Sequence, residues 1–353
     1  MMHDRTRRGG IAPSLVSRFA LALAAVTLPV MVSMPWWAGS GTIRSIVEFS
    51  CYLALAQMWN LLAGYAGLVS VGQQAFVGIA AYALFMAANH FGVDPFAAAG
   101  LSLFAPALLA LGSYALLRRL DGPYFAIGTW VVAEVCRLII SNSEWLGSSS
   151  GMTLRAMQKY APEVREVGVL WLATLMLLLT VGGTSWLLMR SRYGLALTAM
   201  RDDPLAAASQ GVDVRRLKLA IYVAAAIGTG LVGAVYYLNS LRLSPNAGFD
   251  PNWTSIAIFM VMVGGIGTLE GPLIGAALYF AADRLFSDYG ASYMIVLGVL
   301  TVTVAVFARG GVWGIVSTRF DWHLFPTRRR ANPNTTDSTH LARDPTYEPD
   351  QST

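Results

Sequence analysis

Charged side chains are scarce in this sequence. Asp, Glu, Lys and Arg make up only 13% of its 353 residues, whereas hydrophobic residues make up 55%. A soluble domain typically carries about 25% charged residues, so this chain has too few to cover a surface that faces water. Apolar runs of about 20 residues recur along the chain, and this is the length that a helix needs to cross a bilayer. The composition therefore excludes an ordinary soluble domain and predicts an integral membrane protein.

The residue patterns of several enzyme classes are also missing. The chain has only two lysines, Lys159 and Lys218, and neither follows a glycine, so it contains no phosphate-binding P-loop. Its four histidines and two cysteines lack the spacing of a metal site. Residues 147–151 match the Gly-x-Ser-x-Gly motif of serine hydrolases, but they fall in a predicted loop rather than at a strand-to-helix turn. We therefore expect no enzyme activity, no cofactor bound by this chain, and an energy source outside it.

The apolar runs predict an all-α fold, a polytopic bundle of about ten transmembrane helices whose outer surface contacts membrane lipid. Some of these spans are short or broken. The eighth and ninth are separated by the glycine-rich stretch 264–272, and the third is interrupted near its start by polar residues. The candidate spans are 19–37, 45–63, 68–90, 96–117, 122–141, 167–189, 218–240, 253–265, 271–286 and 291–308.

The positions of the basic residues predict the orientation. With the N-terminus in the cytoplasm, the loops and tails on that side hold 18 arginines and lysines, the opposite side holds six, and Arg137 lies within a span. Basic residues accumulate on the cytoplasmic side of membrane proteins, so both termini are expected there. The net charge is +5, but the basic residues are not interleaved with aromatic residues that could stack on bases. We therefore expect no nucleic-acid partner.

These spans form one predicted transmembrane domain, residues 19–318, preceded by a cytoplasmic tail, 1–18. The C-terminal tail, 319–353, is polar and poor in apolar residues. It cannot bury enough surface to fold, and we expect it to be disordered in the cytoplasm. The longest internal loop on the same side is 190–217.

The first segment with functional potential is 60–82, where glycines recur beside Ser70, Gln73 and Gln74. Backbone groups released by a break inside a membrane must be satisfied by protein or by water in a cavity. We interpret these three polar residues as candidates for the solute path. The alternative is close helix packing through small residues, which accounts for the glycines but not for two consecutive glutamines.

The second segment carries two ionisable residues within a span, Glu134 and Arg137. They are three residues apart, so they share one helical face and can neutralise each other. Charged residues within spans usually face the bundle interior or a water-filled cavity. A zwitterionic solute could offer a carboxylate to Arg137 and an ammonium group to Glu134. The alternative is a structural ion pair that fixes the rotation of the helix.

The third segment is the 190–217 loop, which contains Arg201, Asp202, Asp203, Pro204 and Leu205. An Asp-Pro pair is typical of a helix start, Gly211 suits the position after its last turn, and Asp213 can cap the following helix. These signals predict a short helix at the membrane surface that exposes Leu205 and needs a partner to cover it. The alternative is a plain connecting loop.

These segments resemble the permeases of the branched-chain amino-acid ABC transporter family. The resemblance rests on Gly-Tyr-x-Gly-Leu-x-Ser-x-Gly at 64–72, Tyr-x-Ala-Ile-x-Thr with Glu-x-x-Arg-Leu at 124–138, the Arg-Asp-Asp loop at 193–212, and Gly-Gly-x-Gly-Thr-x-x-Gly-Pro-x-x-Gly at 264–275. The motifs occur in this order and cover about 44–315.

The resemblance implies a subunit of a binding-protein-dependent importer in the bacterial plasma (inner) membrane. A homologous second permease, two ABC ATPase subunits that use ATP, and a periplasmic or extracellular solute-binding protein would be its partners. The 190–217 loop would then couple the ATPases to the helices, through Arg201, Asp202, Asp203, Pro204, Leu205 and Gly211. Two alternatives remain open, namely an ABC permease for urea, short amides or another small polar solute, and an ion-driven secondary transporter.

Overall fold

The computed structural model describes residues 27–286, 291–307 and 310–320. The predicted N-terminal tail, 1–18, the start of the first predicted span, 19–26, and residues 321–353 of the predicted C-terminal tail lie outside this part. Within it the chain is almost entirely helical, with one two-stranded sheet. The all-α helical fold is thus confirmed. Residues 27–36 of the first candidate span are helical as well and end in the 3-10 turn Met34–Trp36.

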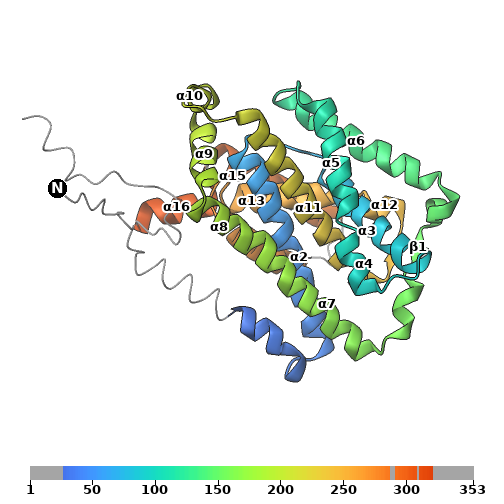
Figure 1. Ribbon diagram of the computed structural model, residues 1–353. Coiled ribbons are helices and arrows are strands. Elements are labelled where there is room, and N and C mark those ends of the chain that lie inside the picture. The colour runs from blue at the N-terminus through green and yellow to red at the C-terminus, as the bar shows by residue number, and fades with distance from the viewer. Residues whose placement is uncertain (1–26, 287–290, 308–309, 321–353) are drawn as a thin grey trace, which may run out of the picture.

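The centre of the bundle is formed by α2 (Ser40–Asn60), α3 (Gln73–Asn89) and α11 (Val214–Ser240), with α7 (Pro162–Leu177) packed on α2 and α11. The second half of α2 is buried on every side, from Ser50 to Asn60. A helix that is apolar all round is stable only inside a protein or a membrane. Figure 1 shows α2, α7 and α11 side by side with nearly parallel axes, α11 running opposite to the other two.

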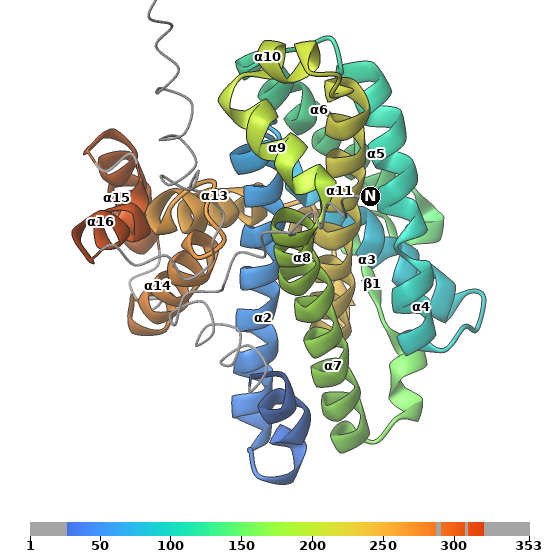
Figure 2. The same cartoon turned by 60° about the vertical axis from the view of Figure 1, so that its left-hand side comes forward.

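Two groups of helices flank this centre. On one flank lie α4 (Pro95–Leu101), α5 (Phe104–Leu117) and α6 (Pro123–Ser141), and on the other lie α13 to α16 (Figure 2). The remaining helices are α8 (Gly183–Arg190), α9 (Arg192–Asp202), α10 (Pro204–Ser209), α12 (Pro245–Gly248), α13 (Asn252–Gly264), α14 (Gly271–Phe286), α15 (Ala291–Phe307) and α16 (Gly311–Phe320). The strands are β1 (Met152–Thr153) and β2 (Arg242–Leu243). Short 3-10 helices cover Glu144–Leu146, Ser148–Ser150 and Arg155–Lys159, and π turns cover Leu61–Tyr65 and Leu178–Gly182.

Five described helical segments are long and apolar enough to cross a membrane: Ser40–Tyr65, Pro95–Leu117, Pro123–Ser141, Pro162–Met189 and Val214–Ser240. Each coincides with a predicted span to within a few residues. The predicted short spans correspond to α13 and α14, which pack against each other. Their backbones approach so closely that a Cβ on Gly275 would overlap the carbonyl group of Met260. The helix α16 was not predicted. The chain is therefore a multi-pass membrane protein.

Loops that are distant in sequence gather at the two ends of the bundle. At one end, β1 pairs with β2, Asn89 Nδ2 donates to the Thr153 carbonyl (2.9 Å), and Arg284 pairs with Glu48 (3.1 Å). At the other end, α9 and the turn 264–270 meet the π turn after α2. We name these the outer and inner ends, after the predicted periplasmic and cytoplasmic sides. The described spans alternate in direction between these two ends, and which end faces the cytoplasm stays a prediction.

We expect a cysteine at Ser209, on α10, to be shielded from an impermeant thiol reagent in intact cells and labelled after permeabilisation. A cysteine at Ser149, in the loop that joins α6 to α7 at the outer end (the outer loop), should react in both conditions. Both native thiols, Cys51 and Cys136, are buried and give little background. Labelling at residue 209 in intact cells would contradict the orientation.

Candidate functional site

The chain breaks between α2 and α3, and the break is satisfied by protein groups. Gly67 adopts a positive φ of 68°, and the chain then runs without helical bonds to Gly72. The Ser70 carbonyl accepts from Trp59 Nε1 (2.9 Å), and the Val71 N–H donates to Thr129 Oγ1 on α6 (3.0 Å). Ser70 itself is fully buried. The break is thus held between α2 and α6.

Gln73 and Gln74 open α3 and are both fully buried. The hydroxyl of Thr229 on α11 donates to Gln73 Oε1 (2.9 Å), and that of Thr254 on α13 donates to Gln74 Oε1. The Gln73 backbone N–H donates to Thr254 Oγ1 (3.1 Å). The glutamines therefore form a polar centre where three helices meet. Thr229 and Thr254 were missed by sequence reasoning, because a single threonine within an apolar span carries no distinctive signal.

One group in this polar centre is left over. Among the described residues, Gln73 Nε2 has no hydrogen-bond partner. A buried donor without a partner costs about 1–3 kcal/mol. This amide is therefore able to donate to a solute or to water, and it keeps the solute-path interpretation of Gln73 open. The contacts of Ser70 and Gln74 do not assign that role to either residue, and for them it stays a prediction.

The glycines of the same segment are explained by packing. A Cβ on Gly72 would overlap the Thr129 carbonyl, and a Cβ on Gly78 would lie 2.6 Å from the Phe249 ring. A Cβ on Gly64 would lie 2.7 Å from the Gly267 nitrogen. Small residues let helices approach to backbone contact. The glycines therefore serve packing, as the alternative interpretation predicts. The glutamines take part in a polar network, and their place in the solute path stays a prediction.

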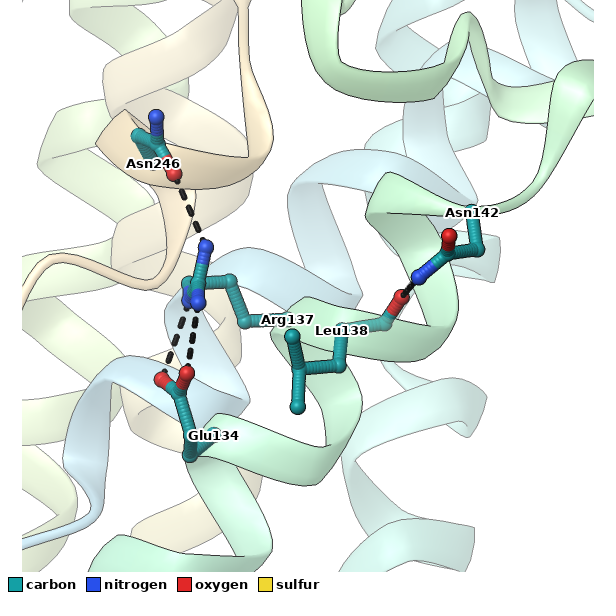
Figure 3. Close-up of polar contacts among 5 residues, drawn as sticks. All are labelled: Glu134, Arg137, Leu138, Asn142 and Asn246. Carbon is teal, nitrogen blue, oxygen red and sulfur yellow. Dashed lines mark hydrogen bonds and ion pairs between the residues drawn. The ribbon is translucent and has the colours of Figure 1, made fainter.

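Glu134 and Arg137 on α6 form the predicted ion pair (Figure 3). Arg137 Nε and Nη2 donate to the two carboxylate oxygens of Glu134 at 2.9 and 2.5 Å. Arg137 Nη1 also donates to Asn246 Oδ1 on α12 (3.0 Å), so the guanidinium lies between α6 and α12. The side chains of Arg137 and Glu134 remain 28% and 45% exposed. The pair therefore joins two elements and also stays accessible.

The two interpretations of this pair predict different outcomes. If it only holds α6, Glu134→Gln and Arg137→Leu should each lower thermal stability, because one charge is left unpaired. The double variant should then regain much of the loss. Asn246→Ala is the matched control, since it removes the α12 contact and leaves the pair. If the pair meets a zwitterionic solute, the double variant should be stable and assembled but transport poorly. Normal transport by a stable double variant would eliminate the solute contact.

The predicted helix at Asp203 exists as α10, and each predicted cap is confirmed. Asp203 Oδ1 accepts from the N–H groups of Leu205 (2.8 Å) and Ala206 (3.1 Å). Gly211 has a φ of 86° and closes the helix with two backbone bonds, Gly211 N to the Ala208 carbonyl and Val212 N to the Ala207 carbonyl. Leu205 is 83% exposed. The element is thus rigid locally, and its apolar side chain is uncovered.

A second helix, α9, precedes α10 and was not predicted. Ser191 caps it by accepting from the Gly194 N–H (3.1 Å), and Asp202 is its last residue. Arg201 points back to the bundle and donates to the Gly267 carbonyl (2.8 Å), with its guanidinium 5.9 Å from the centre of the Tyr65 ring. Arg201 therefore connects α9 to the bundle, and its part in coupling stays a prediction.

Asn60 completes this connection. Its Nδ2 donates to the Thr268 carbonyl and its Oδ1 accepts from the Gly267 N–H, both at 2.7 Å. The end of α2, the turn before α14 and α9 are thus tied together by one arginine and one asparagine. We name this cluster of Asn60, Arg201 and Gly267 the inner latch. Sequence reasoning missed Asn60 because its partners lie 207 and 208 residues away.

The comparison with known proteins decides the family. The family model described as "Branched-chain amino acid transport system / permease component" matches residues 41–305, from the first turn of α2 to the last turn of α15. The chain belongs to this family. It is therefore one component of a transport system, as the motifs and the helical fold predicted.

Individual relatives agree with the family model. The high-affinity branched-chain amino acid transport system permease protein LivM of Escherichia coli K12 is 27% identical over 320 residues, covering 83% of this chain and 73% of that protein. The LivM protein of Salmonella typhimurium LT2 is 26% identical over 321 residues, with the same coverage. A fructose import permease, FrcC of Rhizobium meliloti, is 24% identical over 203 residues, 54% of this chain and 56% of that protein. These relatives are transport permeases rather than enzymes.

Proposed function

We propose that this chain is the permease subunit of a binding-protein-dependent, ATP-driven importer and forms part of the translocation path for branched-chain amino acids. The solute class is supported by the two LivM relatives, which span most of this chain. The observation that carries the ATP-driven mechanism is α10, which is capped at both ends, exposes Leu205 and needs a covering partner. A transporter driven by an ion gradient has no use for such a docking helix.

The inner latch supports a route by which motion at α10 reaches the spans. A partner that moves α10 also moves α9, since the two helices are joined at Asp203. Arg201 on α9 would pull on Gly267, and Asn60 would transmit that displacement to α2. The π turn Leu61–Tyr65 lies at this point, and π turns are frequent at functional sites. The latch therefore links the proposed docking surface to the break in the helices.

The rest of the assembly follows from the family and the sequence. Two ABC ATPase subunits would dock at the inner end and bind the ATP, because this chain contains no P-loop. A homologous permease would complete the path, and a soluble binding protein would deliver solute at the outer end. We assign the complex to the bacterial inner membrane, with both termini of this chain in the cytoplasm.

A second candidate solute class is favoured by one comparison. The match to a fructose permease extends over about half of this chain, so related scaffolds accommodate uncharged polar solutes. An importer for such a solute, or for urea or a short amide, would use the same docking helix and latch. The two classes differ in charge, since an amino acid is a zwitterion.

Uptake assays test the proposal. We expect cells that express the permease pair, the ATPases and the binding protein to accumulate labelled L-leucine, in a manner that requires ATP and resists ionophores. Excess L-valine should compete and excess urea or fructose should not. Accumulation of solute by this chain alone under an ion gradient would contradict the ATP-driven mechanism. Competition by urea or fructose, but not by valine, would show that the solute is an uncharged polar molecule rather than a branched-chain amino acid.

A further inference from the structure

A cavity of about 330 Å³ opens at the outer end, between α2, the end of α11 and the start of α13. Pockets for small ligands begin at about 300 Å³, so this one suits a molecule the size of an amino acid. It is separate from the polar centre at Gln73 and from the ion pair of Glu134. Ser240, Arg242 and Asn252 on its rim are exposed. The cavity is therefore reachable from the side where solute arrives.

Its wall is aromatic. Tyr52, Tyr237 and Trp253 line it and are each less than a tenth exposed, and Tyr236 packs edge-on against Trp253 with 4.8 Å between ring centres. Aromatic residues are common at membrane interfaces, but there they project outward, as Trp36 does with 75% exposure. These rings instead converge around a hollow. Their faces attract cations and their edges pack against aliphatic groups.

Two opposite charges line the same cavity, Arg242 on β2 and Asp250 before α13. They form no ion pair with each other in the described part of the chain. One carboxylate oxygen of Asp250 accepts from the Asn252 N–H (2.9 Å), which fixes the side chain. Two complementary charges held in one cavity but left apart match a solute that carries both charges.

Neighbouring contacts hold two of the aromatic rings and the strand that carries Arg242 in place. The Tyr52 hydroxyl donates to Glu48 (3.3 Å), and Trp253 Nε1 donates to the Ala247 carbonyl of α12 (3.1 Å). Arg242 pairs with Thr153 across the β1–β2 sheet. The outer loop packs on this sheet so closely that a Cβ on Gly151 would overlap the Leu243 carbonyl. The loop therefore positions the strand that carries Arg242.

We propose that this cavity is the first binding site of the permease for a zwitterionic amino acid, with Arg242 facing the carboxylate, Asp250 and the tyrosine faces receiving the ammonium group, and Ile256 and Trp253 contacting the aliphatic side chain. The inference rests on the proposed function and adds the residues that recognise the solute. The site then contacts both charges of the solute, and an uncharged amide or sugar lacks these charges and so loses both contacts.

The test uses the assembled complex in proteoliposomes, with saturating binding protein and labelled L-leucine. We expect Asp250→Asn and Arg242→Gln each to lower the maximum uptake rate about tenfold, since hydrogen bonds to charged groups are the strong ones. Asp250→Glu and Arg242→Lys should recover part of the rate. Glu163→Gln and Arg155→Gln remove one negative and one positive charge elsewhere at the outer end and should have little effect. The half-saturating concentration of binding protein and the basal ATPase rate should not change.

Other outcomes overturn the proposal. A higher half-saturating concentration of binding protein with an unchanged maximum rate would show that Arg242 and Asp250 dock that protein instead. Unchanged uptake in both variants would refute the binding site and leave packing as the role of the aromatic residues. Should Asp250→Asn fail to reach the membrane, Ala247→Leu fills the cavity without removing a charge, and normal uptake by that variant would refute the site. Failure of the wild-type complex to take up leucine would instead contradict the proposed function itself.

Discussion

Replacing Leu205 with aspartate should abolish transport while the permease still folds. Leu205 occupies the second position of α10, after the Asp203 cap and Pro204. An acidic residue is favourable near a helix N-terminus, so the helix itself should persist. At the contact with an ATPase subunit, however, an unpaired buried charge costs about 4 kcal/mol. That cost weakens assembly by about a thousandfold.

Co-purification of the ATPase subunits with the tagged permease measures this effect, together with leucine uptake and the amount of permease in the membrane. Gln210→Glu is the matched control, because it adds the same charge at the other end of α10 without removing the apolar side chain. Leu205→Met should retain assembly. Intact complex and normal uptake in the Leu205→Asp variant would refute the docking role of α10.

Replacing Gly72 with alanine should strongly destabilise the bundle. The added methyl group would overlap the carbonyl oxygen of Thr129, which is backbone and cannot rotate away. Overpacking a core costs about 1–3 kcal/mol and sometimes more, and we expect the upper end because α3 and α6 must separate. The Val71–Thr129 hydrogen bond would be lost at the same time.

Thermal unfolding of the purified protein and its amount in the membrane measure the effect of Gly72→Ala. Gly112→Ala is the control: it lies inside α5, and a Cβ there meets nothing within 4 Å. Alanine improves helix propensity by about 1 kcal/mol over glycine, so this variant should be as stable as the wild type or slightly more so. Equal stability of the two variants would contradict the close contact of α3 with α6.

The sequence predicted local features well where neighbouring residues decide them. The caps of α10 and α11 depend on an aspartate and the two or three residues after it, and Asp203, Gly211 and Asp213 behave as predicted. The Glu134–Arg137 pair is equally local, since three residues on a helix place two side chains side by side. Helix α9 was missed because it lies within a predicted connecting loop and only its Ser191 cap marks its start.

Long-range partners were not predictable from one sequence. Arg201 was predicted to take part in coupling, but the partner of its side chain, the Gly267 carbonyl 66 residues away, was not predicted. Backbone carbonyls have no sequence signature, because every residue carries one. The same applies to the threonines that bond Gln73 and Gln74 and to the cavity between Arg242 and Asp250, whose rings come from three different helices.

By itself, then, the sequence determined that this protein crosses a membrane several times, which family it resembles, and where its capped surface helix lies. These follow from composition, from apolar run length and from residues within one helical turn of each other. Only the tertiary structure decided which glycines serve packing, that Arg201 bonds the turn before α14, and that two opposite charges share an aromatic cavity. Those facts depend on contacts between elements far apart in the chain, and such contacts are fixed when the helices pack.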